Sequence, residues 1–297
     1  MTATTVAAGR TARPRPPSHA RRNASMVATA VLVGWAMVSV GVEPEKLLRL
    51  PGQLLEIASR MFPPDLTYID VAWAGMVESL QMAWVGTLIG AALSLPLGFF
   101  GAKNVSSGAV SNVMRQILNA IRAFPEIVLA ILLVTIVGLG PIAGALAIGI
   151  HSIGTLGKLT AEVIEGIDPG PVEAARAAGG RPIQIQRWGV LPQVLPDTVA
   201  FWLYRFEINI RAAAVLGIVG AGGIGAVLQN TVVYRRWDKA GMAIIIVVVI
   251  TILIDFISGA IRRRIIEGGG GGGLAGDEVE EPSIAGAGLT KVSPDLA

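Results

Sequence analysis

Long apolar runs separated by short polar segments constrain this chain more than any other feature of its sequence. Such runs recur from residue 26 to residue 260, and each is close to the length that a helix needs to cross a bilayer, about 20 residues. Charged residues make up only 15% of the chain. Because lipid offers no partner to exposed backbone groups, and the runs do not alternate as barrel strands do, the sequence predicts an all-α membrane protein.

Six apolar runs predict six transmembrane helices. Proline and glycine mark the breaks between several of them, for example at Pro96 and in the tight turn from Gly138 to Pro141. A cleaved signal peptide is the rival interpretation of the first run, but no small-x-small cleavage site follows it and further spans come later. The predicted spans are residues 26–42, 72–101, 116–138, 141–161, 194–219 and 240–260.

The segments outside the membrane core, residues 71–265, give the predicted organisation. Residues 1–25 form a basic tail that is expected to be disordered, and residues 43–70 form an extracytoplasmic loop. Residues 266–297, with six consecutive glycines and an acidic stretch, form a flexible tail. Most lysines and arginines outside the spans lie on one side if both termini are cytoplasmic. The sequence thus predicts a multi-pass protein of the cell (inner) membrane with both termini inside.

The composition excludes several classes of function. The chain has no cysteine, which removes disulfides, thiolate metal sites and cysteine nucleophiles. His19 and His151 are the two histidines, too few for a histidine metal site. The formal charge of +3, without a basic stripe among aromatic residues, argues against nucleic-acid binding. No Walker-type phosphate loop is present, so we expect no cofactor and no metal on this chain.

The polar stretch between the fourth and fifth predicted spans has the pattern of two short helices. Pro171 suits the first position of a helix, and Gly179-Gly180 ends it. Pro182 can open a second short helix that runs to about Trp188. Two short helices that meet at a glycine corner predict a compact cytoplasmic knob, which can fit a groove in another protein.

The spacing within this stretch resembles the coupling-loop signature of permease subunits of ATP-driven (ABC-type) importers. Glu173-Ala174-Ala175 is followed by Gly179, six residues after the glutamate, and by Leu191-Pro192. The loop, residues 166–192, precedes the last two spans as it does in that family, although Gly189 replaces a common aliphatic residue. The alternative is an ordinary cytoplasmic loop with helix-forming alanines. The resemblance implies an ATPase-coupling surface made of Glu173, Ala174, Ala175, Gly179, Leu191 and Pro192.

Further segments resemble the phosphonate-type branch of that family. They are Trp188 to Pro196, Tyr204 to Gly225, Glu78 to Ala83 and Ile121 to Glu126, and the resemblance covers about residues 70–262. It implies the permease fold of methionine importers, a second permease copy, a dimer of cytoplasmic ATPases that binds ATP and Mg²⁺, and an extracytoplasmic binding protein.

The substrate that this branch implies is phosphonate, phosphate or a related oxyanion, and the chain itself would then not be an enzyme. A permease for methionine or another small nutrient is the nearest alternative, because such permeases share the loop and a glycine-rich turn. A membrane enzyme acting on lipid phosphates and a passive channel are more distant alternatives, since neither needs a coupling loop.

Ionisable residues within the fifth predicted span are candidates for function. Glu207 and Arg211 are four residues apart, which suits a helical ion pair, while Arg205 and Asn209 share another stripe. Two interpretations stay open. The charges neutralise one another and pack the bundle, or Arg205 or Arg211 faces the pathway and meets a passing anion with its planar fork of donors.

Polar residues in the other spans allow weaker predictions. Arg122 and Glu126, four residues apart around a proline, are expected to pair or to kink the helix at a gate. Glu78 and Gln81 either line the pathway or bond across helices. His151 is expected to be a packing histidine rather than a proton relay.

The glycine-rich segment from Gly220 to Gly225 matches the dinucleotide-binding pattern G-x-G-x-x-G. That pattern needs a preceding strand and a βαβ unit, whereas long spanning runs flank this segment. We therefore expect Gly222 and Gly223 to let helices approach, or to let the backbone turn back into the membrane beside the pathway.

Overall fold

The structure is a computed structural model that describes residues 20–41 and 43–268. Within these residues the chain is almost entirely helical and has no β-strand, which confirms the predicted all-α fold. Most of the two predicted tails, residues 1–25 and 266–297, lies outside the described residues. The chain divides into two units, Met1–Ser59 and Arg60–Ala297.

The first unit contains α1, Ala20–Ser39, and most of α2, Pro44–Met61. Polar residues from Arg21 to Asn23 fill the start of α1, and this helix of 20 residues is not among those apolar enough to be a candidate span. The prediction of a span at 26–42 therefore gains no support. The segment predicted as an extracytoplasmic loop, residues 43–70, contains α2, because its leucines recur at helical spacing.

In the second unit, three helices of the described residues are long and apolar enough to cross a bilayer, and two bent pairs of helices are so when each pair is taken together. Counting each bent pair as one span gives up to five in the part of the chain that is described, so the predicted six are not reached. The unbroken helices are α3, Ile69–Gly101, α6, Pro141–Glu165, and α11, Trp237–Gly268.

Proline and glycine cause both breaks. The predicted span at 116–138 is not one continuous helix, because α4, Gly108–Ala123, and α5, Glu126–Val137, meet at 82°. Pro125 disfavours helical geometry at Phe124 and cannot donate a hydrogen bond, so α4 ends before it. The second bend, of 47°, follows α9, Leu191–Leu216, and a short 3₁₀ turn, and it leads into α10, Gly223–Val233.

Small residues bring α3 and α6 into close contact. Gly86, Gly90 and Gly98 recur along α3 at multiples of four residues, so they lie along one face of the helix. A Cβ atom at Gly90 would lie 2.5 Å from the Cβ of Ser152, and one at Gly98 would lie 2.6 Å from Thr160. A larger side chain at either glycine would push the helices apart, as expected for membrane helices that pack through small residues.

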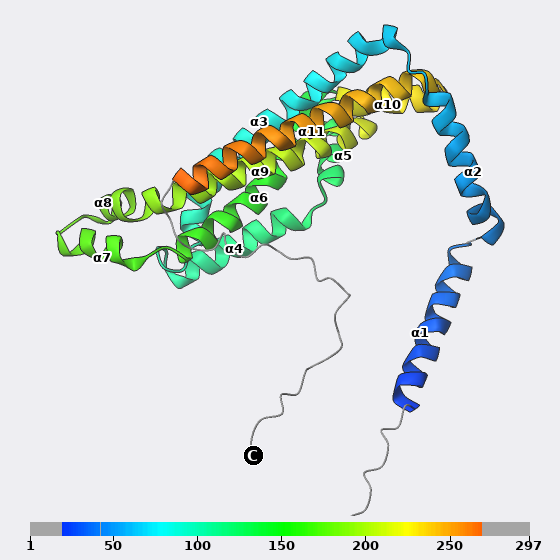
Figure 1. The fold of residues 1–297 in the computed structure, drawn as a ribbon. Coiled ribbons are helices and arrows are strands. Elements are labelled where there is room, and N and C mark those ends of the chain that lie inside the picture. The colour runs from blue at the N-terminus through cyan, green and yellow to red at the C-terminus, as the bar shows by residue number, and fades with distance from the viewer. Residues whose placement is uncertain (1–19, 42, 269–297) are drawn as a thin grey trace, which may run out of the picture. The chain divides into compact units, whose positions relative to one another are not determined.

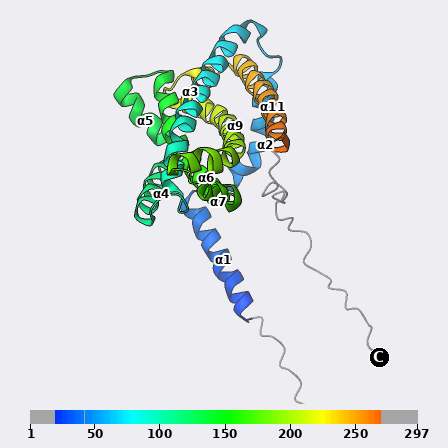
Figure 2. The same cartoon turned by 90° about the vertical axis from the view of Figure 1, so that its left-hand side faces the viewer.

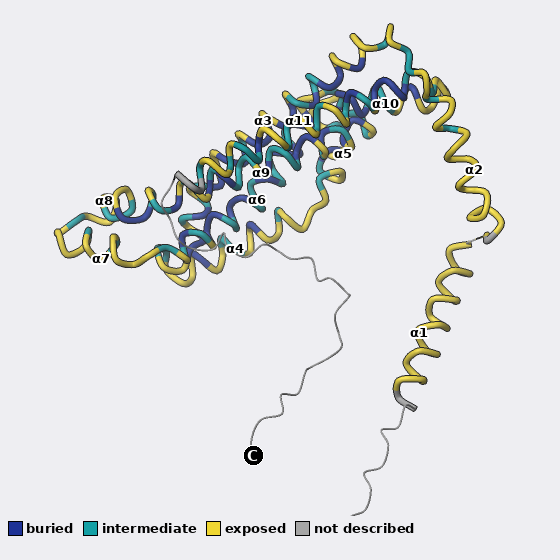
Figure 3. Tube along the Cα trace, in the orientation of Figure 1, coloured by how far each residue is buried: buried dark blue, intermediate teal, exposed yellow. Residues whose placement is uncertain are grey.

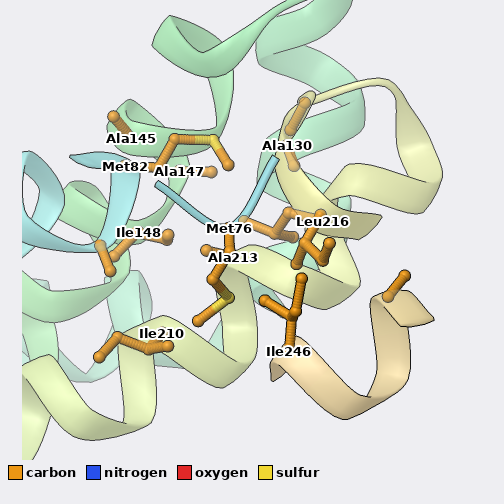
Figure 4. Packing of buried hydrophobic residues seen from close by; sticks show 14 of the residues in the cluster. Met76, Met82, Ala130, Ala145, Ala147, Ile148, Ile210, Ala213, Leu216 and Ile246 are labelled. Carbon is orange, nitrogen blue, oxygen red and sulfur yellow. The ribbon is translucent and has the colours of Figure 1, made fainter. Parts of the chain in front are cut away.

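The long helices run alongside one another, with α7, Pro169–Ala177, and α8, Pro182–Ile185, at one end and α10 at the opposite end (Figure 1). Figure 2 shows α4 and α5 on one side of this bundle and α11 on the other. The core is built mainly from methionine, alanine and isoleucine. Figure 4 shows the packing of Met76, Met82, Ala130, Ala145, Ala147, Ile148, Ile210, Ala213, Leu216 and Ile246.

Candidate functional site

The polar stretch between α6 and α9 forms the predicted pair of short helices. The helix α7 begins at Pro169, two residues earlier than predicted, because the Asp168 carboxylate accepts the Gly170 N–H at 2.9 Å and caps the helix. Gly179, with φ of +76°, makes the corner. The helix α8 then passes through a π-helical turn, Gln186–Val190, directly into α9. We call the segment from Asp168 to Val190 the coupling hairpin.

The residues predicted to couple to an ATPase lie on the outside of this hairpin or at its return to the bundle. Glu173, Ala174, Gly179 and Pro192 are exposed, and Ala175 and Leu191 are half-buried. Figure 3 shows α7 and α8 as mostly exposed helices. Two large apolar side chains, Ile183 and Trp188, are also exposed there, at 77% and 69%. This surface has the apolar and charged mixture expected of a protein contact.

Gly189, the departure from the family pattern, has a structural reason. A Cβ atom at this position would lie 3.1 Å from the Cα of Val172 and 3.2 Å from the carbonyl oxygen of Pro171. The missing side chain therefore lets α7 pack directly on the π-helical turn, and the hairpin closes without the aliphatic residue that is common in the family.

Gln193 ties the two ends of the hairpin together. Its side-chain amide donates to the carbonyl oxygens of Asp168 and Gly189, at 3.2 and 2.6 Å, and its amide oxygen accepts the Asp168 N–H at 3.1 Å. Sequence reasoning missed this residue, because a glutamine in the first turn of a helix gives no sign of a partner 25 residues earlier.

Polar side chains from α3, α5, α6 and α9 meet inside the bundle at Arg205, which is 6% exposed. Its guanidinium lies 2.5 Å from the Glu126 carboxylate and 2.6 Å from Nδ1 of His151, and it donates to the Ser152 hydroxyl at 3.1 Å. The Glu126 carboxylate also lies 2.8 Å from Nδ1 of His151. We call this group, with Asn209 and Thr87, the buried cluster. The acid and the arginine balance each other.

Asn209, fully buried one turn beyond Arg205, completes the buried cluster. Its amide group donates to the hydroxyls of Thr87 and Ser152 at 2.9 and 3.1 Å. Its amide oxygen has no hydrogen-bond partner among the described residues. The cluster therefore offers converging donors and one free acceptor in the interior of the spanning bundle.

A second group of charges, the α9–α11 cluster, consists of Glu207, Arg211, Asp255 and Arg262. The predicted ion pair between Glu207 and Arg211 is confirmed at 2.9 Å. Arg211 also lies 3.2 Å from Asp255, and Arg262 lies 3.1 Å from Glu207. Two acids and two arginines make this cluster neutral overall.

One prediction about a polar pair is corrected. The expected pair of Arg122 and Glu126 does not form, because the 82° bend between them turns Glu126 towards Arg205 and His151. His151 is packed, as expected, and its ring nitrogen Nδ1 belongs to the buried cluster. The bend itself agrees with the alternative prediction of a kink.

The glycine-rich segment turns the chain back against α3. Gly222 and Gly223 have φ of +82° and +67°, which disfavour any side chain. The Gly223 N–H donates to the Glu78 carboxylate at 2.9 Å, and Ser79 accepts the next N–H at the same distance. Glu78 thus bonds across helices and caps α10, whereas Gln81 is exposed.

A family model supports the resemblance of this chain to importer permeases, which the sequence of the hairpin first indicated. The model is described as binding-protein-dependent transport system inner membrane component, and it matches residues 94–267. The match takes in more than half of the chain, including the coupling hairpin and all residues of the two clusters except Thr87. The chain belongs to this family.

Individual relatives show which members of this family the chain is similar to. The phosphite transport system permease protein PtxC of Stutzerimonas stutzeri is 40% identical over 190 residues, which are 64% of this chain and 69% of that protein. The phosphate-import permease protein PhnE of Mycolicibacterium smegmatis is 40% identical over 222 residues, 73% of this chain but only 42% of that protein.

Among solved structures, a chain of the MetNI methionine ABC transporter in an inward facing conformation has a TM-score of 0.60. It is 24% identical, and the match covers 68% of this chain and 99% of that one. At this identity the likeness shows the fold, and it confirms the predicted permease fold of methionine importers.

Proposed function

We propose that this chain is the membrane-spanning subunit of an ATP-driven importer for a phosphorus oxyanion, with both termini cytoplasmic. The coupling hairpin is the observation that carries the proposal. It presents exposed Glu173 and Ala174 at one end of the bundle, and it continues into α9 through an unbroken helical path. A rigid knob fused to a spanning helix can pass the motion of a cytoplasmic partner into the membrane.

The partners follow from this role. A dimer of cytoplasmic ATPase subunits, which would hold ATP and Mg²⁺, docks on the hairpin, and a second copy of this chain completes the pathway. An extracytoplasmic binding protein delivers the substrate. Gln193 locks the two ends of the hairpin, so a push on α7 would move α9 and, with it, Arg205 and Asn209 of the buried cluster. The chain then needs no catalytic residue of its own.

Phosphonate, phosphate or phosphite is the favoured class of substrate. Two relatives at 40% identity are named for phosphite and phosphate transport, whereas a probable D-methionine permease of Vibrio cholerae is only 27% identical. The arginines within the spans suit tetrahedral oxyanions, because a guanidinium offers paired donors to such oxygens. Arg205 and Asn209, or Arg211 on the other face of α9, would contact the anion once the pathway opens.

Uptake by intact cells tests the proposal. Cells with and without this gene receive labelled phosphate, with unlabelled phosphite, methylphosphonate or methionine as competitor. We expect energy-dependent uptake that is lost on deletion and suppressed by one or more of the phosphorus oxyanions, but not by methionine. Competition by methionine alone would transfer the proposal to the methionine alternative.

The coupling surface has a separate test. Ala174→Trp places bulk on the exposed face of α7 without touching the bundle, so we expect ATP-dependent uptake to be lost while the permease stays in the membrane. Glu162→Gln is the matched control, because Glu162 is exposed at the same end of the bundle but outside the hairpin. Normal uptake by the Ala174 variant would show that α7 is not the docking surface.

A further inference from the structure

The break between α4 and α5 lies at the middle depth of the bundle. A Cβ atom at Gly154 would lie 3.0 Å from the backbone nitrogen of Arg122 and 2.9 Å from the carbonyl oxygen of Leu118. The chain at Arg122 therefore rests directly on Gly154, which lies thirteen residues after Pro141 and eleven before Glu165 in the spanning helix α6. Arg122 is accordingly at mid-span.

Arg122 differs from the other two arginines at mid-span. Arg205 is paired with Glu126, and Arg211 is paired with Glu207 and Asp255. The guanidinium of Arg122 has no ion pair and no hydrogen bond within the part of the chain that the structure describes. The acid that its spacing predicts as partner is Glu126, and the bend has turned that acid to the buried cluster. The positive charge of Arg122 is therefore not neutralised by any acid within the described residues.

The surface around this charge is unsuited to lipid. Arg122, Phe124 and Pro125 are all exposed, and the last two form the non-helical link between α4 and α5. Non-helical backbone at membrane depth is tolerated where it lines a water-filled cavity or is buried in protein. Arginine within spans likewise faces a bundle interior or water rather than hydrocarbon. Two independent features therefore place this face of the break on a water-filled pathway or a subunit contact.

We propose that Arg122 lines the translocation pathway and contacts the transported oxyanion, which serves as the counter-ion that the chain does not supply. The inference rests on the proposed function, since it needs an anionic substrate. It also distinguishes Arg122 from the two arginines that have acidic partners within the chain. Arg205 and Arg211 are neutralised within the chain, whereas Arg122 keeps an unshared fork of donors that matches the oxygens of phosphate, phosphite or a phosphonate.

The test uses the complete transporter, with this chain, its ATPase and its binding protein in proteoliposomes, and labelled phosphate as the probe. Uptake and ATP hydrolysis are measured together for the wild type, Arg122→Gln and Arg122→Lys. We expect the glutamine variant to import at least about tenfold less phosphate per ATP hydrolysed, the size of one charged hydrogen bond. The lysine variant, which keeps the charge, should recover much of the loss.

Arg263→Gln is the matched control. Arg263 is an exposed arginine close to the end of α11, away from mid-span, so removing its charge should leave the ratio of uptake to hydrolysis unchanged. Loss of uptake and hydrolysis together, or loss of the assembled complex, in Arg122→Gln would overturn the inference in favour of a subunit contact.

The remaining outcomes separate the inference from the proposed function. Normal phosphate import per ATP by Arg122→Gln, with an active wild type, would overturn the role of Arg122 and leave the importer intact. A wild type that imports neither phosphate, phosphite nor methylphosphonate would overturn the proposed substrate class, and the inference with it.

Discussion

The two charged clusters lie on opposite faces of α9 and differ in their surroundings rather than in their chemistry. Arg205 and Arg211 each face a glutamate at hydrogen-bond distance, and six residues put them on different sides of the helix. Arg205 is 8% exposed at its side chain, whereas that of Arg211 is 48% exposed. An arginine–glutamate ion pair is therefore expected to be necessary for stability where it is buried, at Arg205, and to matter little where it is half-exposed, at Arg211.

Of the changes that test this difference between the two clusters, removing Glu126 should destabilise the protein most. Glu126→Ala leaves the Arg205 charge buried without an acid, and a broken buried ion pair destabilises by about 3–5 kcal/mol. Thermal unfolding of the purified permease, followed by loss of the monodisperse protein, measures the change.

A double variant separates the buried charge from the loss of side-chain packing. Arg205→Met together with Glu126→Ala removes both charges, so most of the lost stability should return. If the double variant were as unstable as Glu126→Ala alone, an uncompensated arginine would not be the cause, and the contrast with Arg211 would lose its basis.

Overpacking the contact between α3 and α6 beside the buried cluster should lower the free energy of unfolding by an intermediate amount. Gly90→Ala places a Cβ atom 2.5 Å from the Cβ of Ser152, whose hydroxyl accepts hydrogen bonds from Arg205 and Asn209. We expect a loss of about 1–3 kcal/mol, as for other overpacked cores. Gly52→Ala, at a position with open space around it, is the control in the same unfolding assay. Equal effects at both glycines would mean that helix propensity, not Ser152, sets the cost.

Arg211→Gln should have the smallest effect on stability. Of its two partners, Asp255 is half-exposed and Glu207 keeps its ion pair with Arg262. Exposed ion pairs contribute about 0–1 kcal/mol to stability. The unfolding temperature should move little, and the same protein should be assayed for phosphate uptake. A large loss of stability would show that a second subunit buries this face, and unchanged uptake would remove Arg211 from the pathway.

The regularities that the sequence predicts well are local. The coupling hairpin follows from Pro171, Gly179-Gly180, Pro182 and the alanine-rich helix, which act over a few residues, although the cap that Asp168 provides starts α7 two residues earlier. The ion pair of Glu207 and Arg211 follows for the same reason, since residues four apart on one helix are neighbours wherever that helix lies. The apolar runs likewise predict the spanning helices, although α1, which begins with polar residues, is not among the candidate spans of the described residues.

Contacts between distant segments could not be predicted. The pairing of Glu126 with Arg205 joins residues 79 apart, and it depends on an 82° bend that turns Glu126 away from its neighbour Arg122. The partners of Glu78 and Gln193 are equally remote in sequence. A single sequence shows that these side chains are polar and lie in or near spans, but not which helix faces them.

The sequence by itself determined that this chain is a bundle of membrane helices with a coupling hairpin, because hydrophobic length and turn chemistry are encoded within each segment. Only the tertiary structure decided which charges are neutralised. Helix packing brings Glu126 to Arg205 and leaves Arg122 exposed at the break between α4 and α5. The reason is that a charge inside a bundle is neutralised by whichever side chain the neighbouring helices place within reach.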